Sequence, residues 1–216
     1  MRFIFSFVVF LLSTSLATAA PICLCYKCAW GTHDNLYSPT TAMAPTLRPN
    51  RCLTSRFLNG DLSDVNRGSI ITFSENSKDN KFVFRVIGLP GDRVQMRSGK
   101  LWLNGQEIPQ SRLPDDVVIM QAVGDLRVYP RCVSQTPIGE TCVRYHYRET
   151  LPNGVSYSVL DLGNIPLDDT PEFTVPEGKV FVLGDNRDNS SDSRISRAAG
   201  GRGFVDFEDI QGIVEP

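Results

Sequence analysis

The sequence has little of several features that would place it in other classes of protein. Its 216 residues carry a formal net charge of only −2, which gives no reason to expect a nucleic-acid partner. It contains no internal repeat and no low-complexity tract. No segment keeps a helical spacing of apolar residues over about 12 positions. Since 41% of the residues are hydrophobic, enough remains for a real core, and we expect one large domain or two small ones that are mainly β.

The first 20 residues lack the length of apolar chain that a membrane span needs. A run of ten residues that is apolar except for Ser6 occupies 3–12 and small, more polar residues follow, whereas a spanning helix needs about 20 mostly apolar residues. The segment then reaches Ala17-Thr18-Ala19, an A-x-A pattern. We predict that residues 1–20 are a cleavable signal peptide, with a membrane anchor as the alternative. In both cases Arg2 stays inside and the rest of the chain crosses.

The cysteines agree with export to an oxidising compartment, because their number is even. Cys132 and Cys142 flank a short loop that contains Pro137 and Gly139, and we predict a disulfide between them. Sequence does not choose among the three possible pairings of the other four, Cys23, Cys25, Cys28 and Cys52. A zinc site built from these four is the competing interpretation. No other metal site and no cofactor is expected.

Short apolar runs separated by Gly, Asn and Pro fill the chain from Tyr37 to Pro109. Four of them have the composition of strands, at 69–73, 82–87, 93–96 and 100–103. Asn104-Gly105 after the last run predicts a hairpin turn. This part of the chain is therefore expected to be a β core.

The composition shifts between Ser111 and about Glu172, where Pro, Asp and Thr become more frequent. Two further strands are predicted there, at 144–149 and 155–160, with a turn between them. We therefore expect the following organisation: a targeting segment at 1–20, a Cys-rich juxtamembrane segment at 21–36, a β core at 37–110 and 173–216, and a smaller inserted β subdomain at 111–172.

A polar loop follows directly after the apolar run at 180–183. It has the sequence GDNRDNSSDSR, at 184–194. Such a density of short polar side chains predicts an ordered loop with local side-chain to backbone hydrogen bonds, and a solvated surface turn is the ordinary alternative. The string resembles the GDNRDNSxDSR signature of type I signal peptidases.

Other blocks resemble the same family, in the family's order. PTTAMAPTL at 39–47 is similar to P-S-G-S-M-x-P-T-L, and FRVIGLPGD at 84–92 is similar to K-R-x-x-G-L-P-G-D. DIQG at 209–212 is a weaker match, and RETLPNG at 148–154 resembles the inserted subdomain of Gram-negative members. The resemblance implies a mainly β fold with an antiparallel core and an inserted β subdomain. It also implies a place at the inner membrane facing the periplasm, or a periplasmic or exported protein if the signal peptide is removed.

Members of that family cleave signal peptides with a Ser nucleophile and a Lys general base, and neither residue stands at its matched position here. A Ser hydroxyl needs an adjacent base, and a Lys can serve when burial lowers its pKa. Ala42 occupies the Ser position and Phe84 the Lys position, while the flanking residues keep both registers. A laboratory Ser→Ala exchange would keep the Lys, so natural divergence explains the double loss better. Losing both groups should cost on the order of 10⁶ in rate.

The resemblance also implies roles for residues near this pair. Thr40 matches the position whose hydroxyl helps to form the oxyanion hole, and the Ala42 N–H is a second donor. Ser190 matches a residue that hydrogen-bonds the Lys. Asp192 and Arg194 match a supporting ion pair, and together with Asp185 they are expected to hold strands together. The groove for substrate is expected to be lined by Met43, Pro45 and Phe84.

Neighbouring residues are poor candidates to replace the missing Ser nucleophile and Lys base. Lys81 lies three residues before Phe84, so strand alternation places it on the opposite face, and the Thr41 side chain is displaced by one residue from the Ser position. We therefore expect a catalytically silent signal peptidase homologue that binds signal peptides or other extended peptides of exported proteins by strand addition, close to a membrane surface. The alternatives are an active peptidase that uses Thr41 with Lys81, and a disulfide-stapled exported β protein that binds no peptide.

Overall fold

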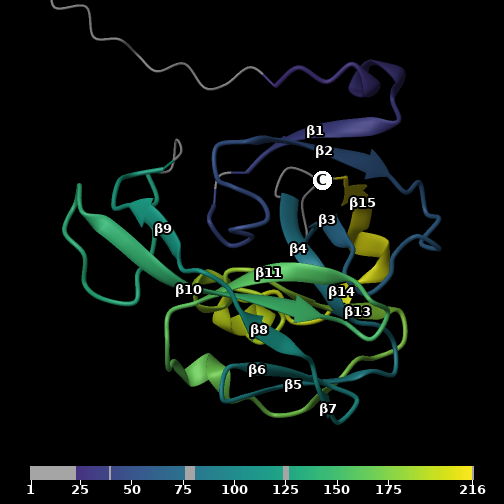
Figure 1. Ribbon diagram of the computed structural model, residues 1–216. Coiled ribbons are helices and arrows are strands. Elements are labelled where there is room, and N and C mark those ends of the chain that lie inside the picture. Colours follow the sequence, from purple (N-terminus) through teal and green to yellow (C-terminus); the bar gives the residue numbers. More distant parts are fainter. Residues whose placement is uncertain (1–22, 39, 76–80, 124–126, 216) are drawn as a thin grey trace, which may run out of the picture.

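The computed structural model describes residues 23–38, 40–75, 81–123 and 127–215, which form antiparallel sheets joined by short loops (Figure 1). The predicted targeting segment at 1–20 lies outside the described residues. Among the helices of the described part, none is long and apolar enough to cross a membrane.

The largest sheet has seven strands and contains the chain on both sides of the predicted insertion. Its spatial order is β1 (His33–Tyr37), β2 (Cys52–Phe57), β15 (Ile210–Val214), β3 (Ile70–Ser74), β4 (Lys81–Gly88), β13 (Lys179–Leu183) and β14 (Val205–Asp206). The last strand of the chain therefore lies between two early ones, which joins the two ends of the described sequence in one sheet.

Two smaller sheets lie beside the large one (Figure 1). The first is ordered β11 (Ser156–Asp161), β10 (Thr141–Thr150) and β8 (Gln110–Arg112), and β9 (Asp116–Ile119) also pairs with β10. The second is ordered β12 (Phe173–Thr174), β5 (Arg93–Arg97), β6 (Lys100–Leu103) and β7 (Gln106–Glu107). In Figure 1, β9 and the start of β10 extend away from the rest of the molecule as an arm.

The helices of the described residues are single 3₁₀ turns. They are η1 (Lys27–Trp30), η2 (Pro166–Asp168), η3 (Arg187–Asn189), η4 (Arg197–Ala199) and η5 (Phe207–Asp209). The predicted fold class, mainly β with an antiparallel core, is confirmed.

The predicted strands are present with small shifts at their ends. The run at 82–87 is the centre of β4, and 100–103 is β6. Asn104 and Gly105 have φ of 53° and 79°, and this left-handed pair closes the hairpin as predicted. Sequence reasoning missed β1 and β2, because neither shows a clear alternation of apolar residues.

Two hydrophobic clusters form the core. One gathers around β3, β4 and β15 and includes Phe73, Phe84 and Met43. The other packs β5 and β6 against β11 and β13 and includes Leu101, Val159 and Phe181. Because β4 contributes Phe84 to the first cluster and Ile87 to the second, this strand connects the two halves of the core.

All six cysteines form disulfides. Cys132 pairs with Cys142, which confirms the prediction. Cys23 pairs with Cys52 and Cys25 with Cys28, so the zinc interpretation of these four is wrong: each sulfur is already covalently bonded to another. The Cys23–Cys52 bridge ties the segment that precedes β1 to the first residue of β2.

Candidate active site

A cavity of about 420 Å³ lies where the two mismatched family blocks meet. One wall is formed by the segment that contains Thr40, Ala42 and Met43, and the other by 81–84 of β4. The positions predicted for the nucleophile and the base, Ala42 and Phe84, therefore line the same cavity although 42 residues separate them in sequence. The fold therefore places these two positions, which lie in separate sequence blocks, beside the same cavity.

The β4 wall of this cavity is an open strand edge. Lys81 to Arg85 pair with β3 on one side, while β13 pairs with β4 only from Arg85 onward. Within the described residues, the second edge of 81–84 has no partner strand, and all four residues line the cavity. The cavity thus runs beside backbone N–H and C=O groups that could pair with another extended chain.

Ala42 is held in place by the polar loop that follows β13. The Asn186 N–H donates to the Ala42 carbonyl at 3.0 Å, and the Asn186 side-chain amide donates to the Thr41 carbonyl at 3.0 Å. A Cβ at Gly184 would come within 2.7 Å of the Ala42 carbonyl oxygen, so only glycine allows this close approach. The signature loop therefore positions the backbone at residue 42.

The predicted groove residues divide between two cavities. Met43 and Phe84 line the cavity described above, but Pro45 does not and lines a neighbouring one instead. The chain turns back immediately after Met43, where the Leu47 N–H donates to the Met43 carbonyl at 2.8 Å. The turn carries Pro45 away from the first cavity, which corrects its predicted place.

Phe84 stands in apolar surroundings. Its side chain is 6% exposed, its ring lies 6.2 Å from that of Phe73, and Met43 belongs to the same cluster. Such a site would keep a lysine uncharged at neutral pH, because burial disfavours the charged amine. Phe84 itself offers no group that could take a proton.

The two substitutes considered for the missing pair have other partners. Lys81 and Phe84 both line the cavity, so strand alternation alone does not separate them, because the cavity follows the edge of β4. The Lys81 ammonium, however, forms an ion pair with Asp34 of β1. The Thr41 hydroxyl accepts a hydrogen bond from the Asn189 side-chain amide at 2.6 Å. No hydrogen bond joins Thr41 to Lys81 in the described part of the chain.

Thr40, the predicted oxyanion-hole residue, is exposed and lines the cavity. Its carbonyl accepts a long hydrogen bond of 3.4 Å from the Ser38 hydroxyl. Its side chain is therefore on the correct wall, next to Ala42, and its role stays a prediction.

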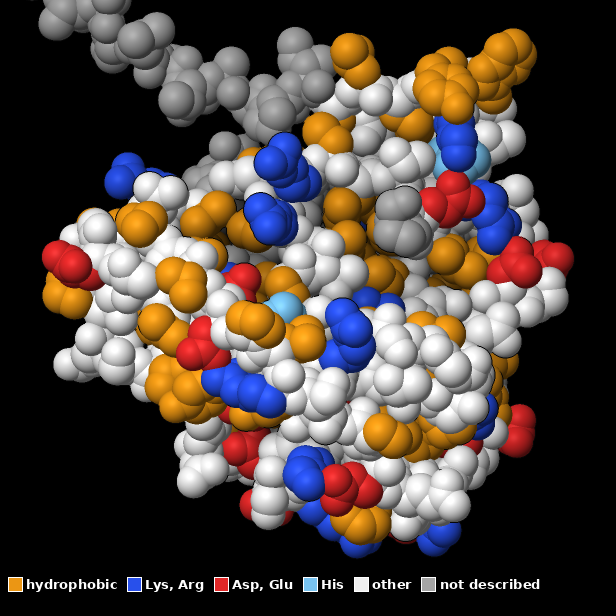
Figure 2. Space-filling model, in the orientation of Figure 1, with side chains coloured by type: hydrophobic (Ala, Val, Ile, Leu, Met, Phe, Trp, Pro, Cys, Tyr) orange, Lys and Arg blue, Asp and Glu red, His pale blue; other side chains and the backbone are white. Residues whose placement is uncertain are grey.

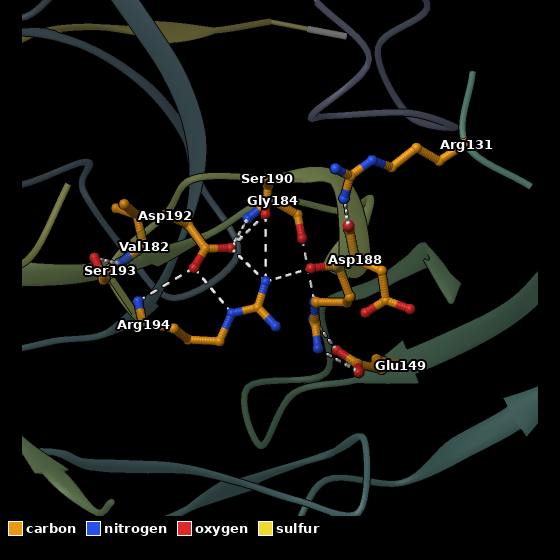
Figure 3. Close-up of polar contacts among 10 residues, drawn as sticks. Arg131, Glu149, Val182, Gly184, Asp188, Ser190, Asp192, Ser193 and Arg194 are labelled. Atoms are coloured by element: carbon orange, nitrogen blue, oxygen red, sulfur yellow. Dashed lines mark hydrogen bonds and ion pairs between the residues drawn. The ribbon is translucent and has the colours of Figure 1, made fainter. Parts of the chain in front are cut away.

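The loop residues Ser190, Asp192 and Arg194 form one hydrogen-bonded network, in which Asp192 and Arg194 are buried and Ser190 is partly buried (Figure 3). Asp192 accepts from the Arg194 guanidinium at 2.9 Å, from the Ser190 hydroxyl at 2.5 Å and from the Gly184 N–H at 3.1 Å. Asp185 is not part of this network. It pairs with Arg85 of β4 through two bonds of 2.7 and 2.8 Å. The Ser190 hydroxyl thus has a partner within its own loop.

A further buried ion pair, between Arg187 and Glu149, was not predicted. Arg187 of the loop binds Glu149 of β10 through bonds of 2.9 and 2.6 Å, and the Tyr157 hydroxyl donates to the same carboxylate at 2.8 Å. Burial raises the pKa of Tyr157 well above its usual value, and the charge of Glu149 adds to the effect. Burial acts to lower the pKa of Arg187, but Glu149 outweighs it and the pKa is raised. The signature already contained Arg187, but nothing in the sequence identified Glu149 as its partner.

The ionisation of the Asp188 carboxyl should make the free energy of unfolding depend on pH. Burial raises the pKa of this carboxyl to about 6, and the charges of Asp161 and Asp168 act in the same direction. A raised pKa means that the folded state favours the proton, so this contribution to stability is complete below about pH 4 and is lost as the pH rises through 6. We expect Asp188→Asn, which carries no charge, to remove this loss.

Urea unfolding of the protein and of Asp188→Asn between pH 4 and pH 7 tests this expectation. The variant should gain stability relative to the parent across that range, by about 1–2 kcal/mol after allowance for solvent screening. Glu208→Gln, at an exposed carboxylate, is the control, and its free energy of unfolding should differ from that of the parent by the same amount at every pH. If the difference between Asp188→Asn and the parent is also independent of pH, the prediction is wrong.

These features define an all-β protein with an open strand edge beside a buried polar loop, and the comparisons with known proteins give the family. The family model described as "Signal peptidase, peptidase S26" matches residues 11–216. The chain belongs to this family and is a homologue of type I signal peptidases. It matches signal peptidase I of Rickettsia prowazekii (strain Madrid E) with 37% identity over 153 residues, which are 67% of this chain and 48% of that protein.

Two further matches have similar coverage of this chain. Signal peptidase I of Rickettsia typhi (strain ATCC VR-144 / Wilmington) is 35% identical over 155 residues, which are 68% of this chain and 49% of that protein. A crystal structure of a signal peptidase I from Enterococcus faecalis V583 is 24% identical and covers 69% of this chain and 96% of its own, with a TM-score of 0.33. The chain spans about half the length of the curated relatives that it matches.

Proposed function

We propose that this protein is a catalytically silent signal peptidase homologue that binds extended peptides, such as the signal-peptide segments of exported proteins. The observation that carries the proposal is the open edge of β4 at 81–84, which faces the Ala42 segment across a cavity of about 420 Å³. An extended peptide that enters this cavity can pair with the free edge, and side-chain pockets can then select its residues.

The proposed lack of catalysis rests on the side chains at the two positions that match the catalytic residues of the family. Ala42 has no hydroxyl and Phe84 no amine, although both line the cavity. The contacts of Thr41 with Asn189 and of Lys81 with Asp34 argue against an active pair made of these two, because a nucleophile and its base must contact each other and here each contacts another residue.

The proposed place of action is the inner membrane facing the periplasm, or the periplasm if residues 1–20 are removed. Three disulfides in the described residues support an oxidising compartment. The proposed partners are signal peptides together with the membrane surface from which they emerge.

Calorimetric titration with a peptide that carries an Ala-x-Ala segment tests the proposal. We expect saturable binding to the purified chain and an intact peptide by mass spectrometry after long incubation. Ser191→Trp should weaken binding by about tenfold or more, because Ser191 is exposed, lines the cavity, and can accept a large side chain without disturbing the core.

The matched control is Ser134→Trp, at an exposed serine that does not line the cavity, and it should bind like the parent. Absence of binding would favour a disulfide-stapled β protein without a peptide partner. Cleavage of the peptide that Lys81→Ala abolishes would instead establish an active enzyme with the Thr41 and Lys81 pair.

A further inference from the structure

A second cavity, of about 310 Å³, adjoins the first and has no role in the site described above. It lies between the segment from Ala44 to Arg51 and the strand β9. Thr41 lines both cavities, so the two share a wall directly beside Ala42. A peptide longer than the first cavity would reach the second at this point.

The wall formed by β9 is another open strand edge. Its four consecutive residues, Asp116 to Ile119, all line the cavity, and because neighbouring side chains alternate between faces the cavity must follow the edge of the strand. In the described residues β9 pairs only with β10.

The outward-facing groups on this edge can be assigned from the hydrogen bonds around β10. The Met120 N–H donates to the Glu140 carbonyl, and the Val143 carbonyl, opposite Val117, accepts instead from Val133. Since antiparallel pairs alternate between bonded and non-bonded, the N–H and C=O of Val117 and Ile119 point to the free edge.

The charges around this cavity are unbalanced. Asp116 forms an ion pair with Arg144, so the charges of these two residues balance each other. Arg48 and Arg51 also line the cavity, are exposed, and have side chains that make no hydrogen bond or ion pair with other described residues. Figure 2 shows Lys and Arg side chains beside hydrophobic ones where the β9–β10 arm meets the rest of the molecule. Arginine guanidinium groups in such a place are complementary to carboxylates.

We propose that the second cavity binds an acidic stretch of the same extended peptide whose small-residue segment occupies the first cavity. The acidic stretch adds as a strand to the free edge of β9, and its Asp or Glu side chains pair with Arg48 and Arg51. This inference rests on the proposed function, since it requires the first cavity to hold a peptide. It narrows the partner to extended peptides that carry carboxylates close to an Ala-x-Ala segment.

Fluorescence anisotropy titrations of the full chain test the inference. The labelled peptides share one Ala-x-Ala segment and carry an Asp-Glu pair before it, an Asp-Glu pair after it, or the corresponding Asn-Gln pair at both places. At least one acidic peptide should bind about tenfold more tightly than the amide peptide at low salt, and the advantage should shrink as salt is added.

Substitutions then assign the effect to the second cavity. In Arg48→Gln/Arg51→Gln the acidic peptide should bind no better than the amide peptide, whose own affinity should be unchanged. Arg93→Gln/Arg148→Gln removes the same charge at exposed arginines that do not line this cavity, and it should keep the preference. Val117→Pro deletes one outward N–H at the free edge. It should therefore weaken the binding of both the acidic and the amide peptides that reach β9.

The possible results separate the two proposals. If all peptides bind equally and Arg48→Gln/Arg51→Gln changes nothing, the second cavity is not a peptide site, while the proposed function stands. If no peptide binds, the proposed function fails first. If the acidic preference survives Arg48→Gln/Arg51→Gln, the carboxylates bind elsewhere and the inference is overturned, whether or not Arg93→Gln/Arg148→Gln changes the preference.

Discussion

Ala42→Ser combined with Phe84→Lys is expected to convert this protein into a peptidase. Both positions line one cavity, and the Phe84 site is apolar, as a lysine needs if it is to lose its proton near neutral pH. The backbone at Ala42 is already held by Asn186 and Gly184. The double variant should cleave an Ala-x-Ala peptide at least about 10³-fold faster than either single variant, because a nucleophile and its base act as a unit.

Mass spectrometry of the cleaved peptide measures the rate, and three variants serve as controls. Ala42→Ser alone lacks the base, Phe84→Lys alone lacks the nucleophile, and Ala42→Ser/Phe84→Met has a side chain of similar length but no amine. Each should leave the peptide intact. If the double variant is folded and binds the peptide but does not cleave it, the assignment of these two positions is wrong.

Breaking the ion pair between Arg187 and Glu149 should cost the protein much of its stability. Both side chains are buried, at 4% and 1% exposure, and they join the signature loop to β10. Removing one partner leaves the other charge buried and unpaired, so we expect Arg187→Met and Glu149→Leu each to lower the free energy of unfolding by about 3–5 kcal/mol. The loop that positions Ala42 should also loosen.

Urea unfolding of the single and double variants measures this cost. Arg187→Met/Glu149→Leu should be more stable than the sum of the single losses predicts, although the Gly184 carbonyl and the Tyr157 hydroxyl each lose a partner in it. Lys100→Met, which breaks the exposed pair with Glu107, is the control and should cost less than about 1 kcal/mol. A loss that small for Arg187→Met would contradict the prediction.

Local patterns in the sequence were enough to predict the strands that carry clear apolar runs, among them β3, β4, β6 and β11. The strand at 100–103 and the turn at Asn104-Gly105 depend on alternation and on a left-handed backbone, which neighbouring residues determine. The strands β1 and β2 were missed because their residues are of mixed polarity and a disulfide and long-range pairing hold them. The same limit applies to Cys23, Cys25, Cys28 and Cys52, whose pairing depends on distances that the sequence does not contain.

The candidate site shows the same division. The sequence by itself determined the family, through the blocks around 42, 84 and 184–194, and it led to the prediction that Ala42 and Phe84 replace the catalytic pair of that family. Only the tertiary structure decided that Lys81 pairs with Asp34, that Arg187 pairs with Glu149, and that Pro45 lines a different cavity. The physical reason is that a motif records which residues are present at a given spacing, whereas the partner of a charge and the wall of a cavity are set by segments far apart in the chain.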